Sequence, residues 1–275
     1  EMLEHTERRL ASDLATQPEV AAELRLALAV MYRELGSYEA AEKMLRPTVE
    51  ILRGLSPENP RSLATALCRL GQALFYQNKY DEAIRELDSS LAIWRSLNEE
   101  GGEEAISAIE ILALVRSKQG KVAEAESMIR EVHELRLKIF PPEHPEVLNA
   151  LGNLGNILFA AKRLDEAEQV YRQLLDTRRK IFGDWHPSVA SSWINLGYVL
   201  MQQKRMDEAR TGLERALEIR RRLLERGHPD RANALLNLGD LERVTGRLAE
   251  AGVLFRELVR DARQRPDDFN QLVMN

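Results

Sequence analysis

The sequence predicts an all-α protein: an α-solenoid of six helix–turn–helix units, preceded by an N-terminal half-repeat or capping helix. Two observations lead to this prediction. Small and apolar residues return at one fixed interval along the chain, and the residues between them follow the spacing of amphipathic helices. A unit of two such helices cannot bury its apolar face alone, so the units must stack on one another.

The composition excludes several functional classes. The 275 residues are 44% hydrophobic and 30% charged, with a net charge of −5. This mild acidity gives no basic excess for nucleic acid or for an anionic membrane surface. The single cysteine, Cys68, excludes an internal disulfide framework and a multi-cysteine metal site, and its place on an apolar helix predicts a packing role.

The interval of the repeat is 42 residues. Six segments align without gaps: LGSYEAAEKML, QNKYDEAIREL, QGKVAEAESMI, AKRLDEAEQVY, QKRMDEARTGL and TGRLAEAGVLF. Upstream of each stands a leucine followed by glycine or alanine, such as Leu154-Gly155. The alanines shared by the six segments are Ala41, Ala83, Ala125, Ala167, Ala209 and Ala251.

Each unit contains two predicted helices. In the unit 145–186, apolar residues recur at helical spacing over 151–158 and, after a break at 162–163, again over 164–175. Small residues at the Leu-Gly and Ala positions would let the two helix backbones approach closely. Proline suits the first turn of a helix and marks the start of most units. These prolines are Pro18, Pro60, Pro145, Pro187 and Pro229.

We expect the units to form one continuous superhelix over residues 1–275. Leu3 and Leu10 stand one interval before Leu45 and Leu52, so the chain opens with half a repeat, either an N-terminal cap or the remainder of an upstream unit. After Ala262 the repeat motif ends, and the last residues are typical of a capping turn or a loose tail. The predicted parts are a capping half-repeat 1–17, the repeats 18–59, 60–102, 103–144, 145–186, 187–228 and 229–265, and a tail 266–275.

These motifs resemble the tetratricopeptide repeat (TPR), whose usual period is about 34 residues with Leu-Gly, Ala and an aromatic at fixed offsets. The turns GDWHPSVA and RGHPDRA resemble those of the 42-residue repeats of kinesin light chains and their bacterial relatives. The resemblance covers about residues 18–265. It implies a right-handed superhelix whose first helices line a concave groove that binds proteins.

A second resemblance concerns the N-terminal stretch that runs from ERRLASDLATQPEV to the first aligned segment. It is similar to the start of the TPR region that follows the kinase domain in certain bacterial serine/threonine protein kinases. The HRD, DFG and glycine-rich motifs of a kinase are absent from this sequence, so kinase catalysis is not implied.

Asparagines gather at the groove-lining positions of the last three units. A carboxamide both donates and accepts, so a ladder of them can bind the N–H and C=O groups of an extended peptide. The alternative is that these asparagines bond neighbouring helices to one another, and both roles can coexist. The predicted peptide-binding residues are Asn149, Asn153, Asn156, Phe159, Asn195, Tyr198, Asn233 and Asn237.

Other candidate chemistry has a structural explanation. His144, His186 and His228 precede the turn prolines, one helix pair apart, and are expected to bond at helix starts rather than to share a metal ion. The Asp-Glu pairs fall in first turns, where they favour the helix dipole. Trp185 either packs on the next helix or belongs to a contact patch. We therefore expect no catalytic residue, no metal and no cofactor.

The sequence thus predicts a non-catalytic module that binds a protein segment, an extended peptide by preference, as the sensor or docking region of a bacterial serine/threonine kinase. The alternatives are a cargo or scaffold adaptor like the kinesin light chain repeats, and a structural element that forms homo-oligomers through its solenoid ends. No segment of this chain is expected to enter a membrane, and the composition favours a cytoplasmic location. The lack of an initiator Met leaves open that the chain is a piece of a membrane-anchored protein.

Overall fold

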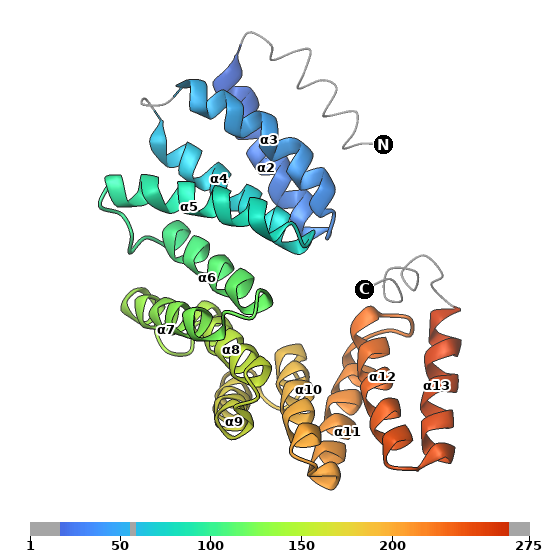
Figure 1. Cartoon of the computed structure of the whole chain (residues 1–275). Coiled ribbons are helices and arrows are strands. Elements are labelled where there is room, and N and C mark those ends of the chain that lie inside the picture. Colours follow the sequence, from blue (N-terminus) through green and yellow to red (C-terminus); the bar gives the residue numbers. More distant parts are fainter. Residues whose placement is uncertain (1–16, 56–58, 264–275) are drawn as a thin grey trace. The chain divides into compact units, whose positions relative to one another are not determined.

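The computed structural model describes residues 17–55 and 59–263, and over these ranges the chain forms twelve helices and no strand (Figure 1). The predicted all-α repeat fold is confirmed. The predicted capping half-repeat 1–17 and tail 266–275 lie almost wholly outside the described residues. The helices are α2 (Pro18–Glu34), α3 (Tyr38–Leu55), α4 (Pro60–Tyr76), α5 (Tyr80–Ser96), α6 (Glu103–Lys118), α7 (Val122–Ile139), α8 (Pro145–Ala160), α9 (Leu164–Phe182), α10 (Pro187–Gln202), α11 (Met206–Leu223), α12 (Pro229–Val244) and α13 (Leu248–Ala262).

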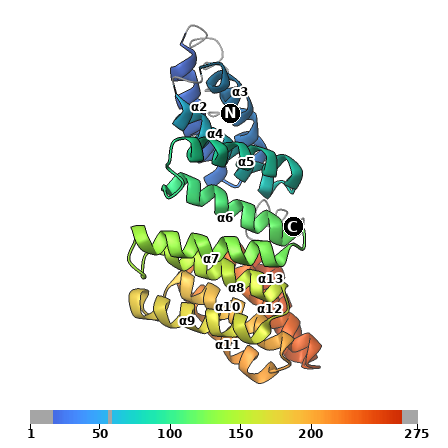
Figure 2. The ribbon, with the colours of Figure 1, turned by 60° about the vertical axis from the view of Figure 1, so that its left-hand side comes forward.

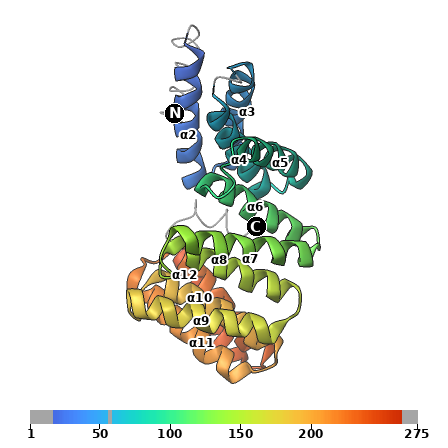
Figure 3. The same ribbon diagram turned by 90° about the vertical axis from the view of Figure 1, so that its left-hand side faces the viewer.

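The helices fall into two compact units, Glu1–Phe140 and Pro141–Asn275, which we call unit 1 and unit 2 and describe separately. Each contains three repeats. Within a unit, helices that follow one another in sequence pack side by side: α3 lies against both α2 and α4, and α11 against both α10 and α12 (Figures 2 and 3). The expectation of one cooperative solenoid over the whole chain stays a prediction.

Histidine caps three of the first helices of unit 2. His144, His186 and His228 stand directly before the prolines, and each ring Nδ1 accepts a hydrogen bond from the backbone N–H two residues later. The N–H donors are those of Glu146, Ser188 and Asp230, at 3.3, 3.2 and 3.1 Å. The ring thus satisfies one of the unpaired donors of the first turn. The predicted structural role of these histidines is confirmed.

The turn within each repeat also follows the 42-residue interval. It places one residue at positive φ and closes with a backbone hydrogen bond from the next N–H to the carbonyl five residues earlier, as from Arg205 to Leu200 at 2.9 Å. This bond caps carbonyls at the end of the first helix. The residues at positive φ are Gly36, Asn78, Gly120, Lys162, Lys204 and Gly246.

Glycine lets the two helices of a repeat approach closely, as predicted. A Cβ atom at Gly71 would lie 2.5 Å from the Leu87 side chain, and one at Gly155 would lie 2.7 Å from the Tyr171 ring. Gly239 has the same relation to Phe255, at 2.6 Å. Because Cβ atoms do not reach such distances, an added side chain would push the helices apart.

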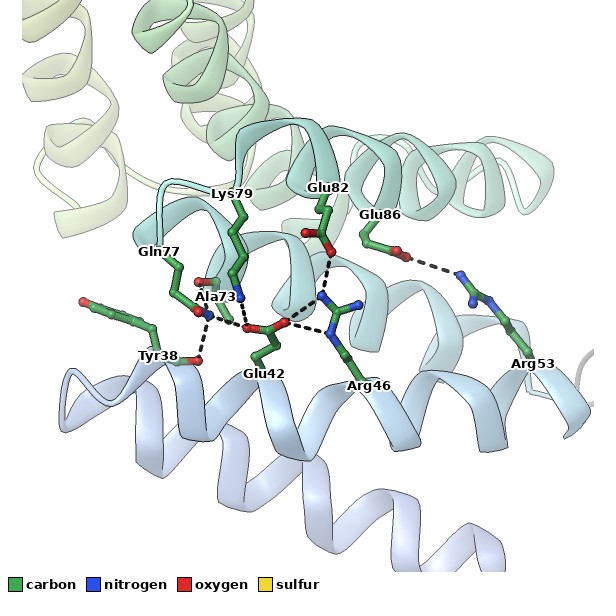
Figure 4. Close-up of polar contacts among 9 residues, drawn as sticks. All are labelled: Tyr38, Glu42, Arg46, Arg53, Ala73, Gln77, Lys79, Glu82 and Glu86. Atoms are coloured by element: carbon green, nitrogen blue, oxygen red, sulfur yellow. Dashed lines mark hydrogen bonds and ion pairs between the residues drawn. The ribbon is translucent and has the colours of Figure 1, made fainter.

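Charged contacts join neighbouring repeats. Gln77 and Lys79, in the turn after α4, donate to Oε2 of Glu42 on α3, both at 2.8 Å, and Arg46 donates to Oε1 at 2.7 Å (Figure 4). Arg46 also reaches Glu82 on α5 at 2.6 Å. Burial alone would raise the pKa of Glu42, but the three hydrogen bonds outweigh it and hold the pKa below its ordinary value.

Unit 2 repeats this contact. Glu168 on α9 accepts from Arg205 in the turn after α10 at 2.7 Å and from Arg172 at 2.8 Å. Burial again acts to raise the pKa of Glu168, and the hydrogen bonds lower it overall. Each of these carboxylates therefore binds the second helix of one repeat to the inner turn of the next.

The last repeat contains a buried ion pair at a contact that is apolar in the preceding repeat. Arg231 Nε lies 3.0 Å from Asp261 Oδ2, and Asp261 is only 2% exposed. The two atoms are not aligned as a hydrogen bond, and neither Asp261 oxygen has a hydrogen-bond donor among the described residues. In the preceding repeat the same positions hold Val189 and Ile219, both fully buried. The ion pair thus replaces an apolar contact.

Candidate functional site

The eight predicted binding residues all lie in unit 2, on the first helices of its three repeats. Asn149, Asn153, Asn156 and Phe159 are on α8. Asn195 and Tyr198 are on α10, and Asn233 and Asn237 are on α12. Of the four residues on α10 and α12, three are joined by hydrogen bonds and three line one pocket, whereas the residues of α8 make contacts of a different kind.

A chain of hydrogen bonds joins α10 to α12. The Tyr198 hydroxyl donates to Asn237 Oδ1 at 2.5 Å, and Asn237 Nδ2 donates to Asn233 Oδ1 at 2.7 Å. Asn237 is 7% exposed, so both ends of its carboxamide are occupied inside the protein. This favours the helix-bonding role for Asn237, while it orients the half-exposed Tyr198 and the exposed Asn233 beside it.

Next to these hydrogen bonds lies a pocket of about 240 Å³. Three of the predicted residues line it, namely Asn195, Tyr198 and Asn233. Asn195 is half-buried, and its carboxamide has no hydrogen-bond partner within the described residues. A donor and an acceptor therefore remain available at the pocket wall. The full lining is Ser191, Ile194, Asn195, Tyr198, Arg220, Asp230 and Asn233.

A buried arginine from α11 completes the pocket. Arg220 is 5% exposed; its Nη2 donates to the Ser191 hydroxyl at 2.8 Å and its Nη1 lies 2.8 Å from Asp230 Oδ2. Burial lowers the pKa of Arg220, and the charge of Asp230 opposes that shift. Because the pair is neutral overall, the pocket suits an uncharged polar group better than an isolated ion.

Arg220 was not among the residues predicted from the sequence, although the sequence contains a signal for it. Arginines stand at the same second-helix position in three successive repeats, Arg136, Arg178 and Arg220. Arg178 donates to the Ser192 hydroxyl at 2.9 Å, and burial lowers its pKa as well. A search of the second helices for polar residues at the 42-residue interval would have found this set.

The four predicted residues on α8 do not line this pocket. Asn156 is exposed, and its Oδ1 accepts a hydrogen bond from the Tyr171 hydroxyl at 2.6 Å. Burial raises the pKa of that tyrosine. Phe159 is half-buried, with the Lys162 ammonium 5.6 Å from its ring centre. Asn153 is half-buried and Asn149 is exposed, so the carboxamides of both residues lie at the surface of α8.

Elsewhere, the described residues offer little reactive chemistry. In the described ranges, no three His, Cys, Asp or Glu side chains are close enough to hold a metal ion. Burial raises the pKa of the Cys68 thiol to about 12, and the side chain is 4% exposed, which agrees with the packing role. Trp185, in the turn before α10, lies against α11: the guanidinium carbons of Arg215 and Arg222 are 4.6 and 4.0 Å from its ring centre. No helix between residues 17 and 263 is long and apolar enough to span a bilayer.

Comparison with protein families gives one match over most of the chain. A family model described as tetratricopeptide repeat matches residues 20–96, 103–180 and 188–264. Among curated proteins, the RxLR effector protein SFI4 of Phytophthora infestans (strain T30-4) is 26% identical over 141 residues. The match covers 50% of this chain and 41% of that protein, so this chain spans less than half of the relative.

Solved structures share the architecture. The kinesin light chain TPR-like repeats from Podosopora anserina superpose with a TM-score of 0.63 at 22% identity, over 75% of this chain and 97% of that one. A Rap protein complexed with competence and sporulation factor gives 0.67 at 11% identity, over 97% and 80%. At these identities the likeness shows the fold alone.

Proposed function

The chain belongs to the tetratricopeptide repeat family, whose members are protein-interaction modules, and from this we propose that it binds an extended peptide segment of a partner protein on the first helices of unit 2. The observation behind the proposal is the pocket on α10 and α12, where the carboxamide of Asn195 has no partner within the described residues. A peptide offers alternating N–H and C=O groups, and a carboxamide can bind one of each.

The volume of the pocket limits which part of a peptide it can accommodate. A volume of about 240 Å³ holds one side chain, not a folded element. Ser191, Asn233 and the Arg220–Asp230 pair line its walls, so that side chain is polar and uncharged. In this proposal Asn195 binds the peptide backbone, and the ring of Tyr198 flanks the pocket. Asn149, Asn153, Asn156 and Phe159 extend the contact along α8.

Asn237 is assigned a positioning role. Its carboxamide orients Tyr198 and Asn233 through the two hydrogen bonds described above. Replacing it would remove both hydrogen bonds, which costs about 0.5–1.5 kcal/mol of stability, because the half-exposed Tyr198 and the exposed Asn233 can bond to water instead. Replacing Asn195 breaks no such bond.

This difference defines the experiment. Peptide-display selection on the purified chain is followed by titration of an enriched peptide into the parent, Asn195→Ala and Gln173→Ala. We expect Asn195→Ala to weaken binding about tenfold or more, the loss of one to two hydrogen bonds, with an unchanged unfolding temperature. Gln173→Ala, on the exposed face of α9, is the control and should bind as the parent does. Equal binding by all three proteins would refute the assignment of Asn195.

The wider context is a second part of the proposal. The resemblance of the N-terminal stretch to kinase-associated TPR regions supports a sensor or docking role beside a serine/threonine kinase in the cytoplasm. The 42-residue repeats and His-Pro turns support a cargo or scaffold adaptor instead. A kinase domain encoded upstream in the same reading frame would support the first, and a partner shared with a transport or scaffold complex the second.

A further inference from the structure

Three successive second helices carry a buried or half-buried arginine at one repeat position, and two of the three are paired with a carboxylate of this chain. In unit 1, Arg136 donates two hydrogen bonds to Glu110, at 3.0 and 2.7 Å. In unit 2, Arg220 Nη1 lies 2.8 Å from Asp230 Oδ2. The third arginine, Arg178 on α9, makes no ion pair within the described residues. It is therefore the exception in this set.

The sequence explains why Arg178 has no carboxylate partner. The two positions that supply the carboxylates in the other repeats hold Gly152 on α8 and Ser188 on α10 beside this arginine. Nη1 of Arg178 donates instead to uncharged groups of α10, the Ser192 hydroxyl at 2.9 Å and the Ser188 carbonyl at 3.3 Å. Its guanidinium is thus held in place without being neutralised.

A guanidinium that is partly removed from water needs a counter-charge more than an exposed one does. Burial lowers the pKa of Arg178, and no carboxylate of the chain opposes that shift, as Asp230 does at Arg220. The negative charge that two repeats supply from within is therefore missing here, and the place suits an anionic group from another molecule.

The surface next to Arg178 leaves room for such a group. In the following repeat, Ile194 occupies the position of Gly152 and lines the pocket described above. Gly152 is half-buried and has no side chain to cover its surroundings. A Cβ atom at this position would have only the Leu174 side chain within 4 Å among the described residues outside the backbone of α8, at 3.5 Å.

We propose that Arg178 binds a carboxylate of the partner segment, so that the peptide bound by unit 2 carries an aspartate or glutamate close to the residue in the pocket beside Asn195. This inference rests on the peptide-binding function proposed above and names the class of its ligand, an acidic peptide. One guanidinium balances one negative charge, and two of its N–H donors match the two oxygens of a carboxylate. A phosphate group carries about −1.5 to −2 charges, which one guanidinium does not balance.

Two substitutions that supply a carboxylate from within the chain test the proposal. Ser188→Asp places it where Asp230 stands in the next repeat, and Gly152→Glu places it where Glu110 stands in the preceding one. Each new carboxylate should pair with Arg178 and compete with the carboxylate of a ligand. Since both reproduce contacts that this fold already makes, we expect both variants to fold and to unfold at a temperature no lower than that of the parent.

A matched control adds the same charge elsewhere on α9. Gln173→Glu lies at an exposed position, roughly 140° around the helix from Arg178 at 3.6 residues per turn. It changes the net charge of the chain as the two test variants do, and it leaves the guanidinium of Arg178 without a partner.

Peptide-display selection is run on the parent, the two test variants and the control. We expect an acidic residue at one position of the peptides enriched on the parent and on Gln173→Glu, and no such preference on Ser188→Asp and Gly152→Glu. An enriched peptide is then titrated beside the same peptide with a carboxamide in place of the carboxylate. The parent should bind the acidic form about tenfold or more tightly, as one hydrogen-bonded charge pair gives, whereas Ser188→Asp should not distinguish the two forms.

The outcomes separate this inference from the function on which it rests. An acidic preference that survives both test variants overturns the inference and leaves peptide binding intact, and so does enrichment of peptides without an acidic residue. Tighter binding of a peptide with phosphoserine at the acidic position overturns the choice of a carboxylate. No enrichment on any of the four proteins refutes the proposed function, and the inference with it.

Discussion

At the scale of single residues, the turn inside each repeat sets the strictest local requirement. Its positive φ is met by glycine at three positions, by Asn78 at one, and by lysine at two, where φ is 60° at Lys162 and 62° at Lys204. A side chain with a Cβ costs roughly 1 kcal/mol or more in that conformation, while glycine adopts it without a steric penalty. The two lysine turns are thus strained where the glycine turns are not.

This strain gives a paired prediction. Lys204→Gly should raise the free energy of unfolding of the chain by about 0.5–1 kcal/mol, since the relief of strain exceeds the added entropy of an unfolded glycine. Gly246→Lys, at the same position one repeat later, should lower it by about 1 kcal/mol or more. Urea unfolding followed by circular dichroism measures both. If Lys204→Gly destabilises the chain, the Lys204 side chain stabilises the turn in a way that its backbone does not reveal.

At the scale of helices, equivalent contacts between a first and a second helix are charged in one repeat and apolar in another. The buried Arg231–Asp261 pair lacks hydrogen-bond alignment, although Arg231 also donates to Glu257 at 3.0 Å. Removing two charges from water is costly, and attraction between them recovers that cost only with good geometry. The apolar residues of the preceding repeat, Val189 and Ile219, avoid the cost altogether.

We therefore predict strong non-additivity at these two positions. Arg231→Val alone should destabilise unit 2 by about 3 kcal/mol, because it leaves the Asp261 carboxylate buried without a counter-charge. Adding Asp261→Ile should restore the parent stability or exceed it, since the pair then matches the preceding repeat. Thermal unfolding of the parent, both single variants and the double variant gives the coupling energy directly. A double variant that remains clearly less stable than the parent would show that the ion pair is a net stabiliser, and additive losses would show that the two residues are not coupled.

The element scale also shows how far the sequence predicts this structure. Helix pairs, close glycines and histidine caps all followed from residues that recur at one interval, because each repeat must make the same contacts as its neighbours. The pocket beside Asn195 did not follow, since it depends on Arg220 reaching from a second helix to Ser191 on a first helix. Likewise, Asn153 and Asn237 occupy the same repeat position, and only the folded structure shows that the carboxamide of Asn237 is bonded to Tyr198 and Asn233.

At the scale of the whole molecule, carboxylates with lowered pKa link its stability to pH. Glu42 in unit 1 and Glu168 in unit 2 have pKa values below the ordinary 4.5 in the folded chain. In the unfolded chain they bind protons at a higher pH, so their stabilisation is fully present above about pH 4.5. It is lost as the pH falls through the folded pKa.

We predict that replacing both carboxylates weakens the dependence of the free energy of unfolding on pH. The free energy of unfolding of the parent should fall between pH 5 and pH 3 more steeply than that of a Glu42→Gln, Glu168→Gln variant. At pH 7 the variant should be the less stable of the two, and the curves should converge at low pH. Urea titrations across this range measure both curves, and a constant offset between them would contradict the role of these carboxylates.

The uniform turn geometry has a consequence for how such a chain changes length. Every repeat ends its first helix with the same backbone bond, so recombination between gene copies of two repeats would join compatible pieces. Excision of residues 187–228 places Pro229 directly after His186. Arg247 would then stand at the same separation from Glu168 along the sequence that Arg205 has now, and could make the same ion pair. Gain or loss of one 42-residue copy keeps the alternation of first and second helices and the turn that joins them. Repeat number can therefore vary in evolution without a new fold having to arise.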